Sequence, residues 1–112
     1  MSKNTLYVFL MLLKNGKWNR IINEYYSPNA CVECISTQEI KDSNWLLKLF
    51  ASAHQVLQYK VENIEITENR LSFAIHSVTK NKNNEIDFTE HLITSFWKNN
   101  AIQKHSHIVS TF

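Results

Sequence analysis

Two histidines near the end of the chain, His105 and His107, stand two residues apart. In an extended strand this spacing places both imidazoles on the same face. Imidazole changes charge near neutral pH, so such a pair can supply a general acid, a general base or metal ligands. The polar run around them, residues 103–107, is equally typical of a strand face whose histidines are hydrogen-bonded or exposed. Both interpretations are open at this point.

Cys31 and Cys34 form a Cys-x-x-Cys motif, a spacing that can serve zinc binding or redox chemistry. The motif lies in a short apolar run, residues 30–35, which favours a strand. On a strand, residues three apart point to opposite faces, so the two thiols can neither share a metal ion nor form a disulfide. We therefore interpret both cysteines as small buried residues.

Three segments in the first half of the chain predict helices. The first, over about residues 3–14, is a nearly continuous apolar run that ends at the turn signal Asn15-Gly16. The second stops before Pro28, which cannot continue a helix. The third ends near His54, which would meet the negative end of that helix dipole. The apolar faces of the second and third segments consist of Trp18, Ile21, Ile22, Tyr25 and Tyr26, and of Trp45, Leu46, Leu49, Phe50 and Ala53.

Near Val56 the hydrophobic period changes from helical to alternating, which predicts strands. A phase slip near Asn63 predicts a β-bulge. The polar loop at residues 81–84 and the runs at about 86–98 and 101–111 complete the pattern. Together these features predict an α+β fold, with three helices packed on one face of a strongly bent antiparallel sheet.

Composition indicates one ordinary globular domain spanning residues 1–112, with 44% hydrophobic and 20% charged residues. The net charge of +2 and the absence of a basic stripe argue against nucleic acid as a partner. The apolar run at residues 6–13 resembles a signal-peptide core, but no small-residue cleavage site follows it, and it is shorter than the roughly 20 residues of a membrane span. We expect a cytoplasmic protein with reduced cysteines and no contact with membranes.

Two patches of sequence resemble the nuclear-transport-factor-2-like superfamily, which includes SnoaL-like polyketide cyclases and ketosteroid isomerase. The first is Trp18 and its amphipathic helix, followed by Tyr-x-x-Asn-Ala-x-Val-x at residues 26–33. The second, residues 96–102, resembles the hairpin before the family's last strand, with Asn99-Asn100 where members often have glycine. Asparagine tolerates positive φ, so this departure is mild. The resemblance implies a cone-shaped fold, with the helices in the concave face of the sheet and a pocket at the open end.

Within that family, the resemblance to ketosteroid isomerase implies where its catalytic groups would fall. The general base would be Cys34, the tyrosine of the oxyanion hole would be Phe9, and its protonated acid would be Leu92. The side chains of Phe9 and Leu92 cannot donate a hydrogen bond to an oxyanion. The chain therefore lacks the steroid-isomerase catalytic set.

The resemblance also implies that His105 faces the pocket and that His107 follows nearer its middle. His105 is the candidate catalytic acid or base. Because the family's first and last strands are neighbours, a zinc site of both histidines and Cys34 is an alternative, although we expect no metal and no cofactor. The expected ligand-binding residues are Phe9, Cys34, Phe50, Leu92, Thr94 and His107.

Our leading hypothesis is a domain that binds a small apolar or amphipathic molecule in an apolar pocket. One alternative is a non-enzymatic dimerisation or protein-interaction module with a filled core. A further alternative is an isomerase, cyclase or hydrolase that uses His105 or His107. Family members often dimerise through their sheets, so we expect a homodimer. It would bury the face away from the pocket, which we assign to His91, Ile93, Ser95 and Trp97.

Overall fold

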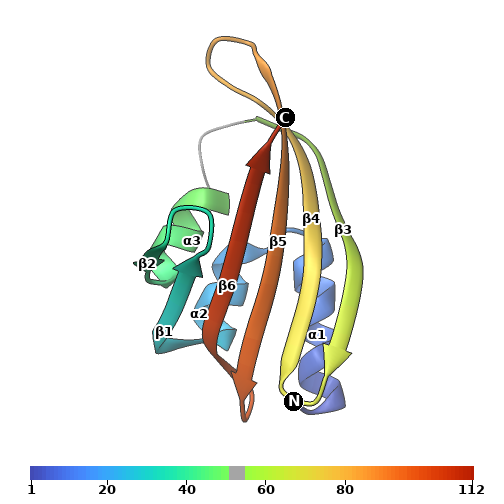
Figure 1. Cartoon of the computed structure of the whole chain (residues 1–112). Coiled ribbons are helices and arrows are strands. Elements are labelled where there is room, and N and C mark those ends of the chain that lie inside the picture. Colours follow the sequence, from blue (N-terminus) through green and yellow to red (C-terminus); the bar gives the residue numbers. More distant parts are fainter. Residues whose placement is uncertain (51–54) are drawn as a thin grey trace.

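The computed structural model describes residues 1–50 and 55–112, and Figure 1 shows their arrangement. The predicted positions of Ala53 and His54 lie outside the described residues. Within the described residues there are three helices and six strands, and no helix is long and apolar enough to cross a membrane. The elements in chain order are α1 (Lys3–Lys14), α2 (Trp18–Tyr25), β1 (Tyr26–Cys34), β2 (Glu39–Lys41), α3 (Ser43–Phe50), β3 (Gln55–Thr67), β4 (Arg70–Lys80), β5 (Ile86–Lys98) and β6 (Ala101–Thr111).

The six strands form one sheet in the order β2-β1-β6-β5-β4-β3, with β2 and β3 at its edges. The prediction of the α+β class is confirmed, but the sheet is mixed rather than wholly antiparallel. The pair β1–β6 is parallel, whereas the other neighbouring strands run antiparallel. The three hairpins that join β3 to β6 leave β6 running in the same direction as β1, so the first and last strands meet in parallel.

The helices begin and end where the sequence provides caps and breaks. The Ser2 hydroxyl accepts a hydrogen bond from the Thr5 amide and caps α1. After α1, Gly16 adopts a positive φ of 66°, which allows the tight turn into α2. Helix α2 ends at Tyr25, and Pro28 lies in β1 within a register shift between Tyr26 and Cys31. Proline lacks an amide hydrogen, so an irregular stretch of strand suits it.

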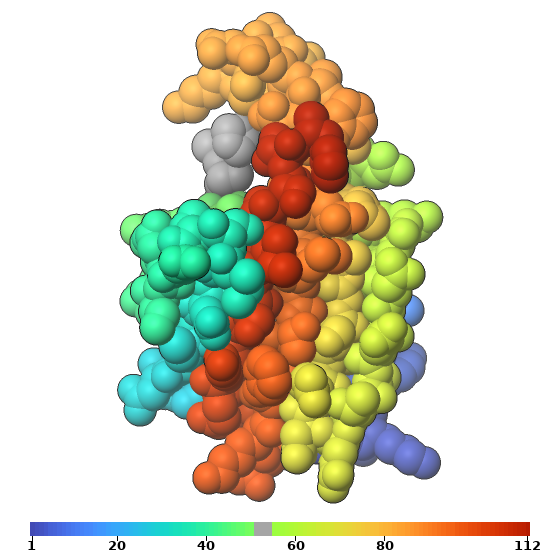
Figure 2. Space-filling view, viewed as in Figure 1, coloured from blue at the N-terminus to red at the C-terminus, as the bar shows by residue number. Residues whose placement is uncertain are grey.

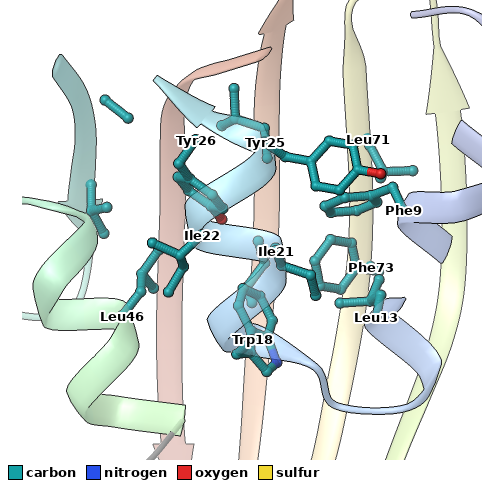
Figure 3. Close-up of a cluster of buried hydrophobic side chains, with 14 of the residues drawn as sticks. Phe9, Leu13, Trp18, Ile21, Ile22, Tyr25, Tyr26, Leu46, Leu71 and Phe73 are labelled. Carbon is teal, nitrogen blue, oxygen red and sulfur yellow. The ribbon is translucent and has the colours of Figure 1, made fainter. Parts of the chain in front are cut away.

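All three helices lie on one face of the sheet (Figure 1), and the core fills the space between them. Phe9 of α1 lies edge-on to Trp97 of β5, with ring centroids 5.0 Å apart, and edge-on to Tyr25 of α2 at 5.3 Å. Figure 3 shows Phe9 and Tyr25 of this cluster, together with Leu71 and Phe73 of β4. Burial of these side chains is the main source of stability. Figure 2 shows the opposite face, where the strands meet solvent.

The predicted irregularity near Asn63 is confirmed. The register of β3 against β4 shifts between Glu62 and Glu65, and Asn63 has a positive φ of 56°. An extra residue in one strand turns the following side chains to the other phase. This accounts for the change in alternation that the sequence shows along β3.

The predicted orientation of β5 is wrong. His91, Ile93, Ser95 and Trp97 are buried beneath the helices. Leu92 is 42% exposed on the other face, and Thr94 shares that face with it. The alternation of side chains along β5 was predicted correctly, but each side chain was assigned to the opposite face of the sheet. The expected dimer face is therefore the buried one, and Leu92 and Thr94 point away from the helices.

Candidate functional site

Four polar side chains form a continuous chain of hydrogen bonds beneath the helices. Tyr26 Oη lies 2.6 Å from His105 Nδ1, His105 Nε2 lies 2.8 Å from His107 Nδ1, and His107 Nε2 lies 2.9 Å from His91 Nδ1. We call these four residues, Tyr26, His105, His107 and His91, the histidine chain. All four side chains are buried, and His105 is fully so. Each inner imidazole uses both ring nitrogens within the chain.

Strand pairing places the members of the histidine chain. His105 and His107 are two residues apart on β6, so they share a face, as predicted. His107 is paired with Ile93, and His91 is two positions before Ile93 in β5, which makes the two histidines diagonal neighbours. The parallel β1–β6 pairing brings Tyr26 to the start of β6, opposite Ile102. The histidine chain thus spans three adjacent strands, β1, β6 and β5.

Burial determines the charge of the histidine chain. Loss of hydration lowers the pKa of His91 to about 4, of His105 to about 3 and of His107 to about 2. Burial raises the pKa of the Tyr26 phenol well above its usual value. At neutral pH the histidine chain therefore consists of three neutral imidazoles and a neutral phenol. A neutral imidazole donates at one nitrogen and accepts at the other.

The histidine chain meets two cavities at His91. One has a volume of about 510 Å³ and lies between α3 and strands β4–β6. The other, which we call the aromatic cavity, has a volume of about 470 Å³ and lies between the α1–α2 turn, α3 and strands β3–β5. One wall is the stacked pair of Trp18 and Phe50, with ring centroids 4.1 Å apart and planes at 7°. The Tyr59 hydroxyl fixes another wall, donating to the Leu13 carbonyl at 2.8 Å and accepting from the Trp18 indole at 3.1 Å. The remaining lining residues are Lys14, Asn15, Gly16, Leu49, Val56, Ile75, Ser77 and Thr79.

No protein-family model and no curated protein sequence matches the chain, but solved structures match nearly all of it. A candidate SnoaL-like polyketide cyclase from Mesorhizobium loti has a TM-score of 0.77 at 15% identity, covering 96% of this chain and 98% of that one. An NTF2-like protein of unknown function from Cytophaga hutchinsonii has a TM-score of 0.69 at 10% identity, covering 96% and 98%. The chain has the SnoaL-like, nuclear-transport-factor-2-like fold. IdmH of Streptomyces antibioticus, a candidate polyketide cyclase, has a TM-score of 0.66 at 12% identity, covering 96% and 90%.

Within this SnoaL-like fold, the predicted site residues do not share one cavity. Phe50 lines the aromatic cavity beside His91, whereas Phe9 is fully buried in the aromatic core. Cys34 and His107 border a separate cavity of about 360 Å³ near β2. Leu92 and Thr94, predicted to line the pocket, lie on the far face of the sheet in a shallow groove. His105 borders none of these cavities; whether it takes part in a reaction stays a prediction.

The alternative zinc site lacks available ligands. Cys34 and His107 are neighbours across β1 and β6. Both nitrogens of His107 are already hydrogen-bonded to other histidines, so neither points a free lone pair at the thiol. Across residues 1–50 and 55–112, no group of three histidine, cysteine or acidic side chains is placed to hold a metal ion.

His91 and Tyr26 are the members of the histidine chain that sequence reasoning missed. His91 was assigned to the wrong face of β5, and Tyr26 was assigned to a helix. The large apolar residues Ile93 and Trp97, in phase with His91, were the available signal for its burial. Tyr26 offered no such signal, because its role depends on the parallel pairing of β1 with β6.

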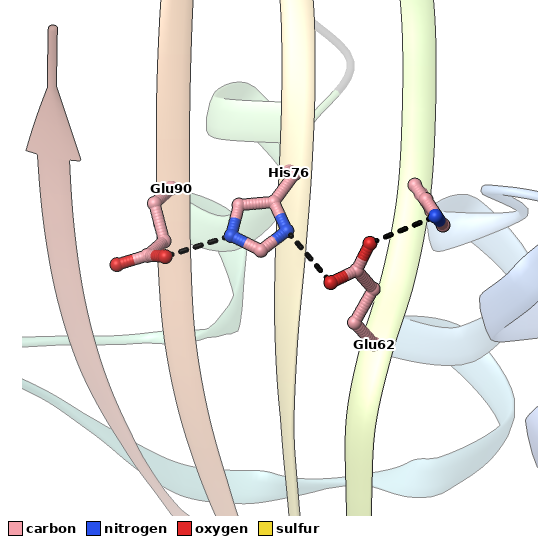
Figure 4. Close-up of polar contacts among 4 residues, drawn as sticks. Glu62, His76 and Glu90 are labelled. Atoms are coloured by element: carbon pink, nitrogen blue, oxygen red, sulfur yellow. Dashed lines mark hydrogen bonds and ion pairs between the residues drawn. The ribbon is translucent and has the colours of Figure 1, made fainter.

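A second polar network lies on the opposite face of the sheet, around His76. His76 Nε2 is 2.7 Å from a Glu90 carboxylate oxygen, and its Nδ1 is 3.6 Å from Glu62 (Figure 4). Lys60 lies 3.0 Å from Glu62, and its hydrogen bond and charge lower the pKa of that carboxyl group. These side chains are 30–64% exposed, and none of them lines the aromatic cavity.

Proposed function

We propose that the chain is a small-molecule-binding domain whose ligand occupies the aromatic cavity beside His91. The observation that carries this proposal is the combination of stacked aromatic walls with one buried histidine at the cavity wall. Apolar walls remove ligand surface from water, and a few polar groups fix the orientation of the ligand. Trp18 and Phe50 suit a flat, apolar or amphipathic molecule. His91, Ser77 and Thr79 supply the polar contacts.

The cavity can be tested with 2-ethylnaphthalene as an apolar probe. Gly16 is the only glycine in the chain and borders the cavity, so its amide resonance is a unique NMR reporter. We expect saturable shifts of the Gly16 amide and of the Trp18 indole N–H. Ser77→Phe places a ring in the cavity and should abolish these shifts. Thr94→Phe places the same ring on the far face and is the matched control. Absence of saturable shifts in the parent protein would refute the proposal.

Homodimerisation through the sheet is the second candidate function. Its specific support is a group of exposed apolar side chains on the face without helices: Ile35 is 44% exposed, Leu92 42% and Ile108 37%. These three residues border one groove. A dimer would use this face rather than the buried one first expected. Binding and dimerisation use opposite faces of the sheet, so they are compatible.

The enzymatic alternative places His105 or His107 in an acid–base role. Both imidazoles are buried, and both nitrogens of each are hydrogen-bonded, so they would affect a ligand in the aromatic cavity only through His91. In this case His105 and His107 are positioning residues. Substituting either by alanine would then alter turnover by changing the protonation pattern of His91.

A further inference from the structure

We propose that Tyr26 sets the direction of hydrogen bonding along the histidine chain and thereby makes His91 Nε2–H a fixed donor into the aromatic cavity. This donor selects ligands with a carbonyl or deprotonated hydroxyl oxygen. The proposal rests on the binding function and names the chemical class of the ligand. It follows from the order of donors and acceptors along four buried side chains.

A chain of neutral imidazoles donates in one direction throughout, because each ring carries one proton. If the Tyr26 hydroxyl donates to His105 Nδ1, then His105 Nε2–H donates to His107, and His107 Nε2–H donates to Nδ1 of His91. Every donor then has an acceptor within the histidine chain, except the N–H at His91 Nε2, which ends it. In the opposite direction, the proton of the Tyr26 hydroxyl would need a different acceptor.

The opposite direction leaves that proton unsatisfied. Among the described residues, the only hydrogen-bond partner of Tyr26 Oη is His105 Nδ1, and the Tyr26 side chain is buried. A buried donor without an acceptor loses the full free energy of its hydration. The first direction is therefore favoured, and Tyr26 is the residue that favours it.

The consequence at the cavity is a donor of fixed type. His91 Nδ1 accepts from His107, so the proton of the neutral His91 ring is on Nε2. Within the described residues Nε2 has no hydrogen-bond partner and is not a fully buried unsatisfied atom, and His91 borders the aromatic cavity, so this N–H is the group available to a ligand there. This N–H matches an oxygen that only accepts, such as that of a ketone, an enolate or a phenolate. It also stabilises negative charge that develops on such an oxygen without moving a proton.

His91 is a hydrogen-bond donor rather than an acid. If its Nε2 proton left, protons would shift along the histidine chain and the last would come from Tyr26. That shift ends in a buried phenolate, which burial strongly disfavours, since it raises the pKa of Tyr26. The histidine chain thus holds the His91 proton in place.

The direction of hydrogen bonding can be measured in the free protein, independently of any ligand. Long-range ¹H–¹⁵N spectra of histidine-labelled protein distinguish protonated from unprotonated ring nitrogens. We expect the Nε2–H tautomer at His91, His105 and His107. An Nδ1–H tautomer at His91 would overturn the proposal.

Tyr26→Phe tests the role of the phenol in the same spectra. A water molecule in the space of the lost hydroxyl can partner His105 Nδ1 as donor or acceptor, so both directions become available. We expect a second population of His91, protonated at Nδ1. If the variant keeps the single Nε2–H tautomer, Tyr26 does not set the direction.

The ligand class can be tested with two probes of similar shape, 2-acetylnaphthalene and 2-ethylnaphthalene. For each protein, the ratio of the two dissociation constants gives the preference for the ketone over the hydrocarbon. We expect this preference to be about tenfold larger in the parent protein than in His91→Phe. The infrared carbonyl stretch of bound ketone should move to lower frequency in the parent protein only. If both probes bind but the preference and the stretch are the same in both proteins, the donor role is refuted. If neither probe binds, the binding function itself fails, whereas the tautomer spectra still decide the role of Tyr26.

Discussion

Mild acid should unfold this protein through the histidine chain. His91, His105 and His107 have lowered pKa values in the folded state because burial disfavours their charged forms. Between these values and the unfolded value of about 6.5, the unfolded chain binds more protons than the folded one. Their contribution to stability is therefore fully present above about pH 6.5 and is lost as pH falls towards the folded pKa values.

The magnitude follows from proton linkage. At about pH 5.5, one unit below the unfolded pKa, each histidine that stays neutral lowers the free energy of unfolding by about 1.4 kcal/mol. Three such histidines lower it by about 4 kcal/mol, which is a large part of the roughly 5–15 kcal/mol available to a domain. Glu39 and Glu62 have lowered pKa values, so they take up protons only at lower pH.

Urea unfolding followed by circular dichroism, at pH values from about 7 to about 5, measures this loss directly. We expect the slope below pH 6 to approach about 4 kcal/mol per pH unit. His91→Phe removes one of the three groups and should reduce the slope by about 1.4 kcal/mol per unit. A free energy of unfolding that stays constant from pH 7 to pH 5 would refute the burial of three neutral imidazoles.

Three further substitutions test the packing and the assembly. Leu92→Glu places a charge on the exposed sheet face and should weaken any dimer at least about tenfold in sedimentation equilibrium; a parent protein that is monomeric at high concentration contradicts the dimer. Phe9→Ala empties a fully buried site and should lower the free energy of urea unfolding by about 3–5 kcal/mol. Tyr59→Phe leaves the Trp18 indole N–H without its acceptor and removes one of the two donors to the Leu13 carbonyl, which keeps the Gly16 amide, and should cost about 1–3 kcal/mol in the same assay.

The positions of the elements could be predicted because local chemistry determines them. Helix α1 covers residues 3–14 as predicted, since an uninterrupted apolar run ends at Asn15 and Gly16. The hairpin between β5 and β6 forms where predicted, and Asn99 there has a positive φ of 58°. Periodicity, caps and turn residues act over short distances, so a single sequence contains this information.

The orientation of β5 could not be read from its sequence because both faces carry large apolar residues. Ile93 and Trp97 lie on one face, and Leu92 and Phe96 on the other. Alternation predicts a strand here but gives no contrast between its two sides. The correct phase depends on which face the helices cover, and that is a property of the whole fold.

The candidate site was only partly predictable for the same reason. The shared face of His105 and His107 follows from their spacing. Their partners do not, because Tyr26 is 79 positions away from His105 in the chain, and His91 is 16 positions away from His107. Long-range strand pairing brings them together. A sequence pattern without contact information does not reveal such a network.

Burial is what gives the histidine chain its direction. In the exposed network around His76, water can serve any donor or acceptor that Glu62 or Glu90 leaves unpaired, so the tautomer of the ring is not constrained by the protein alone. Beneath the helices no such exchange is available, and the need of the buried Tyr26 hydroxyl for an acceptor decides the protonation pattern of three rings. Apolar residues could fill the same space with less sensitivity to acid, but they would present no N–H at the cavity. The feature that distinguishes this core from an apolar one is therefore the single donor that it places at His91.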